Sequence, residues 1–216
     1  MTAAHPTQGA PLFFLLVSSL AEDSHWIYIA DHPVFNIENS NQKLTTLTTK
    51  GITKMPIPGS IATAAVSFKY NADFLKKNVD GLSDEEWTHC PDGCANHILW
   101  IVGHVTWARS AILKRLGQEW SKPWMSVFAR GAKSDGPPAY PTPAEATLAW
   151  DESCALLSAA MESASEEALA APSLQGPPSA DGKVSGVINF LAYHETYHIG
   201  QASYLRGWLG HPGVMG

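Results

Sequence analysis

Charged residues are scarce in this sequence, and basic residues are scarcer than acidic ones. The chain of 216 residues has 14 Lys and Arg against 20 Asp and Glu, which gives a formal net charge of −6 at pH 7. A dedicated nucleic-acid-binding protein needs clustered Lys and Arg to neutralise phosphates, and the sequence has no run of basic residues. The composition therefore predicts that no nucleic acid is a partner.

The sequence also lacks a long hydrophobic run and a basic leader. Residues 11–20, PLFFLLVSSL, are apolar but too few to span a bilayer, and the first basic residue is Lys43, so a secretory signal is not indicated. The three cysteines, Cys90, Cys94 and Cys154, are odd in number and too few for a four-thiolate zinc site. These absences predict a cytoplasmic protein with no membrane partner.

Hydrophobic residues make up 45% of the chain, but residues 1–58 show no helical or strand period. We expect this segment to be an N-terminal extension outside the fold, and residues 59–216 to form one domain. One hypothesis is that translation starts at Met55, because codons for Lys50 and Gly51 can form a purine-rich ribosome-binding sequence upstream. The alternative is a genuine, loosely attached extension or a pair of edge strands, since WIYIA and PVFNI have strand character.

Apolar residues recur at three- and four-residue steps from residue 60 onward, which predicts helices. We expect four long helices, at about residues 60–80, 94–116, 142–164 and 184–209. Residues 120–142 hold four prolines, so they form a long connection rather than a helix. Four helices with one long crossover loop predict an all-α four-helix bundle.

Short motifs indicate where several helices begin. Ser60 is a suitable N-cap for the first helix, and Ser83 with Glu86 forms a capping box for a short helix. Thr142, followed by a proline in the first turn and by Glu145, is the clearest start of a helix. These signals predict that the long connection ends at residue 142.

The stretch YHETYHIGQ, residues 193–201, lies on the last expected helix. His194 and His198 are four residues apart, so both imidazoles project from one face. That face also carries Leu191 and Leu205, which predicts that the histidines point into the bundle. Two buried neutral imidazoles need partners, and a shared metal ion satisfies both. The alternative is that each histidine is a hydrogen-bonded core residue.

A metal site of the catalytic kind needs about three protein ligands and an open position, so the third ligand is expected from another helix. His104 is the best candidate, because it lies in the apolar stripe of Ile101 and Ala108 on the second long helix. His97 lies two turns earlier on a similar face and stays as the alternative. The remaining histidines fall in expected loops or in the N-terminal segment, where we expect exposure to solvent.

H-E-x-x-H is also the zinc-protease signature, in which Glu195 would be the general base. The extended protease motif continues with a glycine and a third histidine, but this chain has Gln201 and Tyr204 at those positions. No Glu or Asp follows His198, and no strand is expected that could hold an extended peptide. A protease is therefore not favoured.

The stretch YHETYHIGQASYLRGWLG, taken with NHILWIVGHVTWARSAILKRLG, resembles the DinB (damage-inducible) superfamily of metalloenzymes. The resemblance covers about residues 60–210 and implies a four-helix bundle with a divalent metal ion, often zinc or nickel, and frequent homodimers. Characterised members include S-transferases and a maleylpyruvate isomerase that use mycothiol, bacillithiol or glutathione. The metal ligands that it implies here are His104, His194 and His198.

We therefore expect a metal-dependent enzyme of the thiol S-transferase type, which acts on a small electrophile with a low-molecular-weight thiol as cosubstrate. Glu195 is the candidate catalytic residue, as a base or an orienting group; alternatively it is a buried charge paired at a helix interface. Gln201 either bonds a ligand histidine or packs against a neighbouring helix. Arg109, Arg115 or Arg206 could bind an anionic thiol. Two other functions stay open, a noncatalytic metal-binding stress-response bundle and a metal-dependent hydrolase that uses Glu195.

Overall fold

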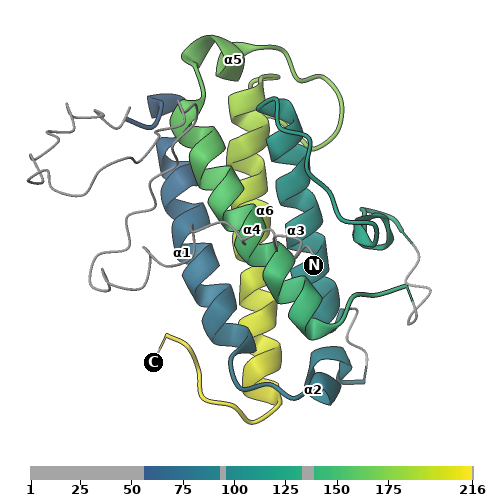
Figure 1. Ribbon diagram of the computed structural model, residues 1–216. Helices are drawn as coiled ribbons and strands as arrows, with labels where there is room; N and C mark the ends of the chain where they lie inside the picture. The colour runs from purple at the N-terminus through teal and green to yellow at the C-terminus, as the bar shows by residue number, and fades with distance from the viewer. Residues whose placement is uncertain (1–55, 93–95, 133–138, 216) are drawn as a thin grey trace, which may run out of the picture. The chain divides into compact units, whose positions relative to one another are not determined.

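The computed structural model describes residues 56–92, 96–132 and 139–215, all of them helical or irregular apart from one isolated β-bridge (Figure 1). The expectations for residues 1–55, including the start at Met55, lie outside these ranges. The all-α fold class is confirmed. The four long helices are α1 (Ala62–Val79), α3 (Ile98–Arg115), α4 (Pro143–Ser163) and α6 (Val184–Trp208). The short elements are η2 (Gly59–Ile61), α2 (Asp84–Thr88), η3 (Met125–Phe128) and α5 (Glu166–Ala170).

The long helices form a bundle in which α6 packs against α1 and α3, and α4 packs against the same two helices. Figure 1 shows the four lying side by side, with α2 near one end of the bundle and α5 near the other. The predicted crossover is the connection between α3 and α4, and its turn η3 contacts α3. This contact brings a loop segment against the helix that carries His104.

The orientation of α6 follows from its apolar stripe and from two polar contacts with α1. Leu191 and Leu205 are buried, as the sequence pattern predicts. Asn71 Nδ2 donates to Thr196 Oγ1 at 3.0 Å, and Thr196 lies between the two histidines in sequence. A buried amide needs such a partner, so this contact favours one rotation of α6 about its axis. No helix within the described ranges is long and apolar enough to cross a membrane.

Both predicted capping boxes are confirmed, whereas the predicted N-cap of the first helix is wrong. Ser83 bonds reciprocally with Glu86, and Thr142 with Glu145, at the starts of α2 and α4. Ser60 lies inside the turn η2, and its hydroxyl donates to a Glu166 carboxylate oxygen at 3.0 Å instead of capping α1. A long-range partner therefore outcompetes the local cap that the sequence favours.

The start of α3 also differs from the prediction at residue 94. The helix begins at Ile98, and His97 is its N-cap, with the ring Nδ1 accepting a hydrogen bond from the Trp100 backbone N–H at 3.1 Å. Imidazole is an uncommon N-cap, so this helix start was not predictable from residue preferences.

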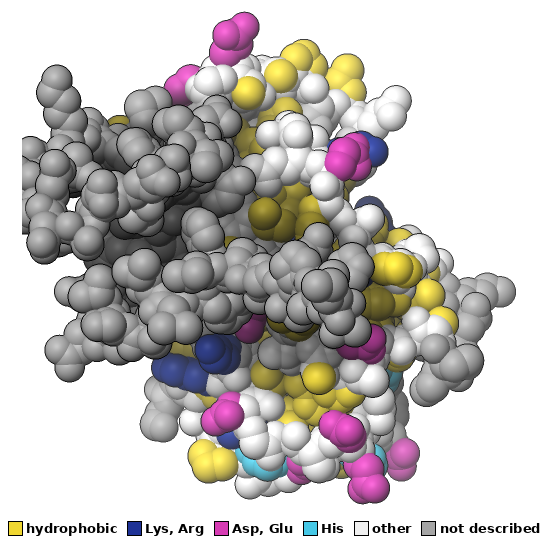
Figure 2. All heavy atoms as spheres, in the orientation of Figure 1, with side chains coloured by type: hydrophobic (Ala, Val, Ile, Leu, Met, Phe, Trp, Pro, Cys, Tyr) yellow, Lys and Arg dark blue, Asp and Glu magenta, His cyan; other side chains and the backbone are white. Residues whose placement is uncertain are grey.

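The described part of one face carries more acidic than basic side chains. Figure 2 shows Asp and Glu spread over that surface, and Lys and Arg confined to small areas. This distribution agrees with the net charge of −6. It offers no extended basic surface there of the kind that phosphate backbones require.

Candidate metal centre

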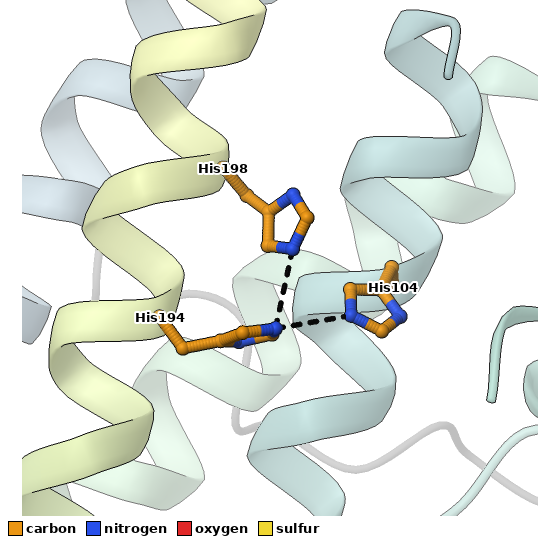
Figure 3. A group of neighbouring side chains, drawn as sticks. All are labelled: His104, His194 and His198. Atoms are coloured by element: carbon orange, nitrogen blue, oxygen red, sulfur yellow. Dashed lines mark hydrogen bonds between the residues drawn. The ribbon is translucent and has the colours of Figure 1, made fainter. Parts of the chain in front are cut away.

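Three histidine side chains from two helices meet between α3 and α6 (Figure 3). His194 Nε2 lies 3.2 Å from His104 Nε2 and 3.2 Å from His198 Nε2, and the three nitrogens all lie within 4.8 Å of one another. Nitrogens about 2.0–2.1 Å from one zinc ion lie about 3.3 Å apart at the tetrahedral angle. The group could therefore hold a metal ion, and the described residues contain no other such cluster of His, Cys, Asp and Glu.

His104 is held on α3 by the crossover connection. Its Nδ1–H donates to the Phe128 carbonyl oxygen at 2.7 Å, which leaves the lone pair of Nε2 facing the other histidines. The close approach of Phe128 depends on Gly103, because a Cβ at that position would lie 2.7 Å from the phenyl ring. Burial lowers the pKa of His104, while the bond to Phe128 opposes this shift. The ring is therefore a neutral ligand at pH 7.

His198 is oriented by a residue on its own helix. Its Nδ1–H donates to Gln201 Oε1 at 2.8 Å, and Gln201 Nε2 donates to the Tyr197 hydroxyl at 3.0 Å, which fixes the direction of the amide. Gln201 thus bonds a candidate ligand, one of the two roles considered for it. Burial, with smaller effects of His104 and His194, lowers the pKa of His198 to about 4. Both His104 and His198 therefore present Nε2 lone pairs to the centre.

His194 provides the test of whether the donor set fits a metal ion. Its Nδ1 is buried and has no hydrogen-bond partner, and its Nε2 faces the other two Nε2 atoms. Because His104 and His198 carry their protons on Nδ1, one proton on His194 cannot satisfy both facing lone pairs. Burial, followed by the charges of His104 and Arg130, lowers the pKa of His194 to about 4, so a second proton is disfavoured. A divalent cation would accept all three lone pairs, so the residues fit a metal ion.

Aromatic rings border the imidazoles on both helices. Trp100 stacks on His104 with ring centroids 4.5 Å apart, and Trp107 lies 5.6 Å from the same ring. Phe190 and Tyr197 are the aromatic neighbours of the two histidines on α6. Trp100 and Trp107 therefore lie beside the site. An aromatic surround limits water around the ligands and suits an apolar or aromatic substrate.

Glu195 lies between the two histidines in sequence but faces another direction. It is 1% exposed and accepts two hydrogen bonds from Arg109, from Nε at 2.7 Å and from Nη2 at 2.9 Å. Arg109 is also 1% exposed, donates to Cys154 Sγ at 2.9 Å, and lies 3.9 Å from the centre of the Trp150 ring. Both carboxylate oxygens of Glu195 therefore accept hydrogen bonds from a buried cation on α3.

The other sequence candidates are not brought to the histidine cluster. His97 caps α3 through its Nδ1, and it does not belong to the cluster. Arg115 donates to the Ala111 and Gln175 carbonyl oxygens, and Arg206 donates to carbonyl oxygens near the ends of α1 and α6. Arg109 is paired with Glu195. All three arginines that the sequence offered for binding an anionic thiol are therefore engaged in contacts within the protein.

Two residues near the histidines were missed in the sequence, Phe128 and Arg130. Phe128 supplies the carbonyl that orients His104, and the charge of Arg130 reaches His194. Both lie in the proline-containing connection, which has no hydrophobic period from which a position could be derived. One signal was present: Gly103, directly before His104 in a helix, marks a close approach by another segment.

Comparison with known families agrees with this arrangement. The sequence pattern of the DinB superfamily matches residues 68–202, more than half of the chain. The matched span includes His104, His194 and His198 as well as Gln201. No curated protein matches the chain. The helical bundle, the match and the position of the histidine cluster within it lead to one conclusion: this chain belongs to the DinB superfamily.

Proposed function

We propose that this protein is a metal-dependent enzyme in which His104, His194 and His198 bind a divalent cation, zinc or nickel, and which joins a low-molecular-weight thiol to a small electrophile. The observation that carries the proposal is the convergence of three Nε2 atoms, two of which are fixed as lone-pair donors by Phe128 and Gln201. Three neutral ligands leave the full charge of a dication in place. Such a cation, when bound, would favour the thiolate form of a thiol at neutral pH.

The chain contributes position and surroundings to this reaction. The thiol sulfur forms a bond to an electrophilic carbon of the small molecule, and the bond from that carbon to its leaving group breaks. The leaving group departs with the electron pair, and the thiol proton passes to solvent or to the leaving group. Trp100 and Trp107 offer apolar surfaces next to the imidazoles, where an electrophile can be held in a partly water-free environment. Hydrogen bonds at Nδ1 of His104 and His198 prevent those rings from turning away.

We propose that Glu195 positions the histidines instead of acting as a catalytic base. Its contacts with Arg109 tie α6 to α3 within one helical turn of the cluster. Action as a base would require the carboxylate to leave a buried cation, which carries a large free-energy cost. This favours the transferase over the alternative of a hydrolase that uses Glu195.

A noncatalytic metal-binding bundle is the second candidate, because the same three imidazoles could serve it. The observation that favours the enzyme is partial access, since His194 is only half-buried whereas His104 and His198 are buried. A purely structural site is normally closed by a fourth protein ligand, and the cluster includes none from the described residues. An open position is what a small-molecule substrate needs.

We also propose that the protein is a cytoplasmic homodimer. Support for the dimer comes from a row of exposed aromatic side chains on one face of α6: Tyr193, Tyr197, Tyr204 and Trp208 are 72, 57, 72 and 47% exposed. Aromatic residues are enriched in protein interfaces and are seldom left in such a row on a monomer. Light scattering of the protein and of a Tyr193→Lys/Tyr204→Lys variant tests this, and an unchanged mass would argue against this face.

The experiment on the site compares metal content and thiol transfer. Purified protein should hold one equivalent of metal, and His104→Ala and His194→Ala should lose it, whereas the control His89→Ala should not. Thiol consumption is then followed with bacillithiol, mycothiol or glutathione and a panel of electrophiles. Metal retained in both site variants would refute the three-histidine site. If the protein binds metal but shows no metal-dependent turnover with any thiol, the result favours a noncatalytic metal-binding bundle.

A further inference from the structure

The two histidines with a bonded Nδ1 differ in what holds the acceptor of that bond. His104 donates to the Phe128 carbonyl oxygen at 2.7 Å, and this oxygen belongs to a backbone that lies close against Gly103. His198 donates instead to Gln201 Oε1 at 2.8 Å, on a side chain that is only half-buried. A glutamine side chain has several staggered rotamers, so it can turn away from the imidazole. The support of His198 therefore depends on what holds the far end of Gln201.

Tyr197 holds that far end. Gln201 Nε2 donates to the Tyr197 hydroxyl at 3.0 Å, and the spacing of four residues puts both side chains on one side of α6. The Tyr197 ring also meets the His198 ring edge-on, with centroids 5.2 Å apart. Tyr197 therefore contacts the candidate ligand directly through its ring and indirectly through the amide of Gln201.

The other two tyrosines in the aromatic row of α6 lack such a bond. Tyr193 and Tyr204 are each 72% exposed, and neither hydroxyl forms a hydrogen bond with a described residue. An aromatic side chain in an interface needs its ring more than its hydroxyl. The bond made by the Tyr197 hydroxyl thus points to a role at the histidine cluster, in addition to any role of its ring in the row.

We infer that Tyr197 is a positioning residue for the metal ion, which acts through Gln201 and His198. This rests on the proposed function, since it concerns the affinity of the same three-histidine site. A glutamine loses much rotamer freedom when it is ordered, and one bond to an imidazole offsets only part of that loss. The bond to Tyr197 offsets more of it and keeps Oε1 against Nδ1 of His198. The His198 proton then stays on Nδ1, and the Nε2 lone pair is available to the ion.

The test measures zinc affinity by chelator competition in Tyr197→Phe, with Tyr204→Phe as the matched control. Both changes remove one hydroxyl and keep the ring, but Tyr204 lies about 9 Å along the helix from His198. Tyr197→Phe should weaken zinc binding about threefold to tenfold, the effect of one neutral hydrogen bond, and Tyr204→Phe should leave it unchanged. Gln201→Leu removes the direct partner of His198 and should weaken zinc binding about tenfold to a hundredfold.

A second background separates an effect that passes through Gln201 from a general effect of the phenol. The carboxylate introduced by Gln201→Glu has only acceptor oxygens, so it receives the His198 Nδ1–H in either orientation. It needs no partner to direct it, and Tyr197→Phe should therefore change zinc affinity less than about twofold in this background. An equal loss in both backgrounds would overturn the inference, as would an unchanged affinity of Tyr197→Phe or an equal loss in Tyr204→Phe.

Failure of the proposed function is a separate result, namely that wild-type protein binds no zinc. In that case metal-free protein still decides the role of Tyr197, because its bond to Gln201 does not depend on the metal. Proton–nitrogen correlation spectra of isotopically labelled protein at neutral pH report which ring nitrogen of His198 carries the proton. Wild type and Tyr204→Phe should hold it on Nδ1, and Tyr197→Phe should show a mixture of both tautomers. Identical spectra of the His198 ring in wild type and Tyr197→Phe would refute the inference.

Discussion

Replacing Glu195 by Gln should destabilise the bundle strongly, because it removes charge from a buried pair while keeping the shape of the side chain. Both partners are 1% exposed, and two bonds of 2.7 and 2.9 Å join them. After the change, the Arg109 guanidinium remains buried with only neutral acceptors. Breaking a buried pair in this way costs about 3–5 kcal/mol, a large share of a typical unfolding free energy of about 5–15 kcal/mol.

The matched control is Glu152→Gln. Glu152 pairs with Lys122 at 2.6 Å, a contact shorter than either bond to Glu195, but the two side chains are 37 and 30% exposed. Exposed pairs contribute about 0–1 kcal/mol, so this variant should be nearly as stable as wild type. The comparison therefore separates burial from distance as the source of the effect.

The assay is urea unfolding followed by far-ultraviolet circular dichroism, with a chelator present so that metal binding does not contribute. The double variant Arg109→Met/Glu195→Leu removes both charges and should recover most of the stability, since apolar residues of similar volume can replace a buried pair. A loss below about 1 kcal/mol in Glu195→Gln would refute the reasoning. Wild-type stability combined with lost turnover would instead restore Glu195 as a catalytic residue.

Three further predictions follow from contacts around the site. Gly103→Ala should displace the Phe128 ring, because the new Cβ would lie 2.7 Å from it. The variant should lose about 1–3 kcal/mol of unfolding free energy and bind zinc more weakly in a chelator competition. Unchanged zinc affinity would contradict the role of the α3–α4 connection in supporting His104. Burial raises the pKa of the Cys154 thiol to about 11, so iodoacetamide at pH 8 should leave it unmodified in the folded protein but not in urea, as peptide mass mapping would show. Burial lowers the pKa values of His194 and His198 to about 4, whereas unfolded histidines titrate near 6.5, so the unfolded chain binds more protons between these values. The unfolding free energy of metal-free protein should therefore fall as pH falls from about 6.5 to 4, and in His194→Ala this fall should be smaller; identical pH profiles would contradict the assignment.

The long helices and the histidine pair could be predicted because both depend on local spacing. A period near 3.6 residues places apolar side chains on one face, and the same period places His194 and His198 there together. The position of His104 in the apolar stripe of its own helix favoured it as the third ligand, but His97, on a similar face, stayed as the alternative; the structure shows that His97 is the N-cap of α3. Capping boxes at Ser83 and Thr142 succeeded for the same reason, since each motif is complete within four residues.

The contacts that the sequence did not indicate join distant segments. Ser60 meets Glu166 across 106 positions, and this contact replaces the cap that local rules favour. Arg109 and Glu195 are 86 positions apart, and their pairing depends on how α3 and α6 pack. The Phe128 carbonyl reaches His104 from a connection without hydrophobic period, where backbone groups rather than side chains provide the contact. Spacing rules cannot report such partners before the packing is known.

The role of the glutamate in H-E-x-x-H follows from helix geometry. Each residue turns the helix by about 100°, so Glu195 points about 100° away from His194 and about 60° away from His198. In this bundle that direction is the interior, where Arg109 lies, and not the open side of the metal site. The four-residue spacing thus determines only that two imidazoles share a face. Whether the glutamate between them is free to take a proton depends on which charge the neighbouring helix presents, and here that charge is a buried guanidinium.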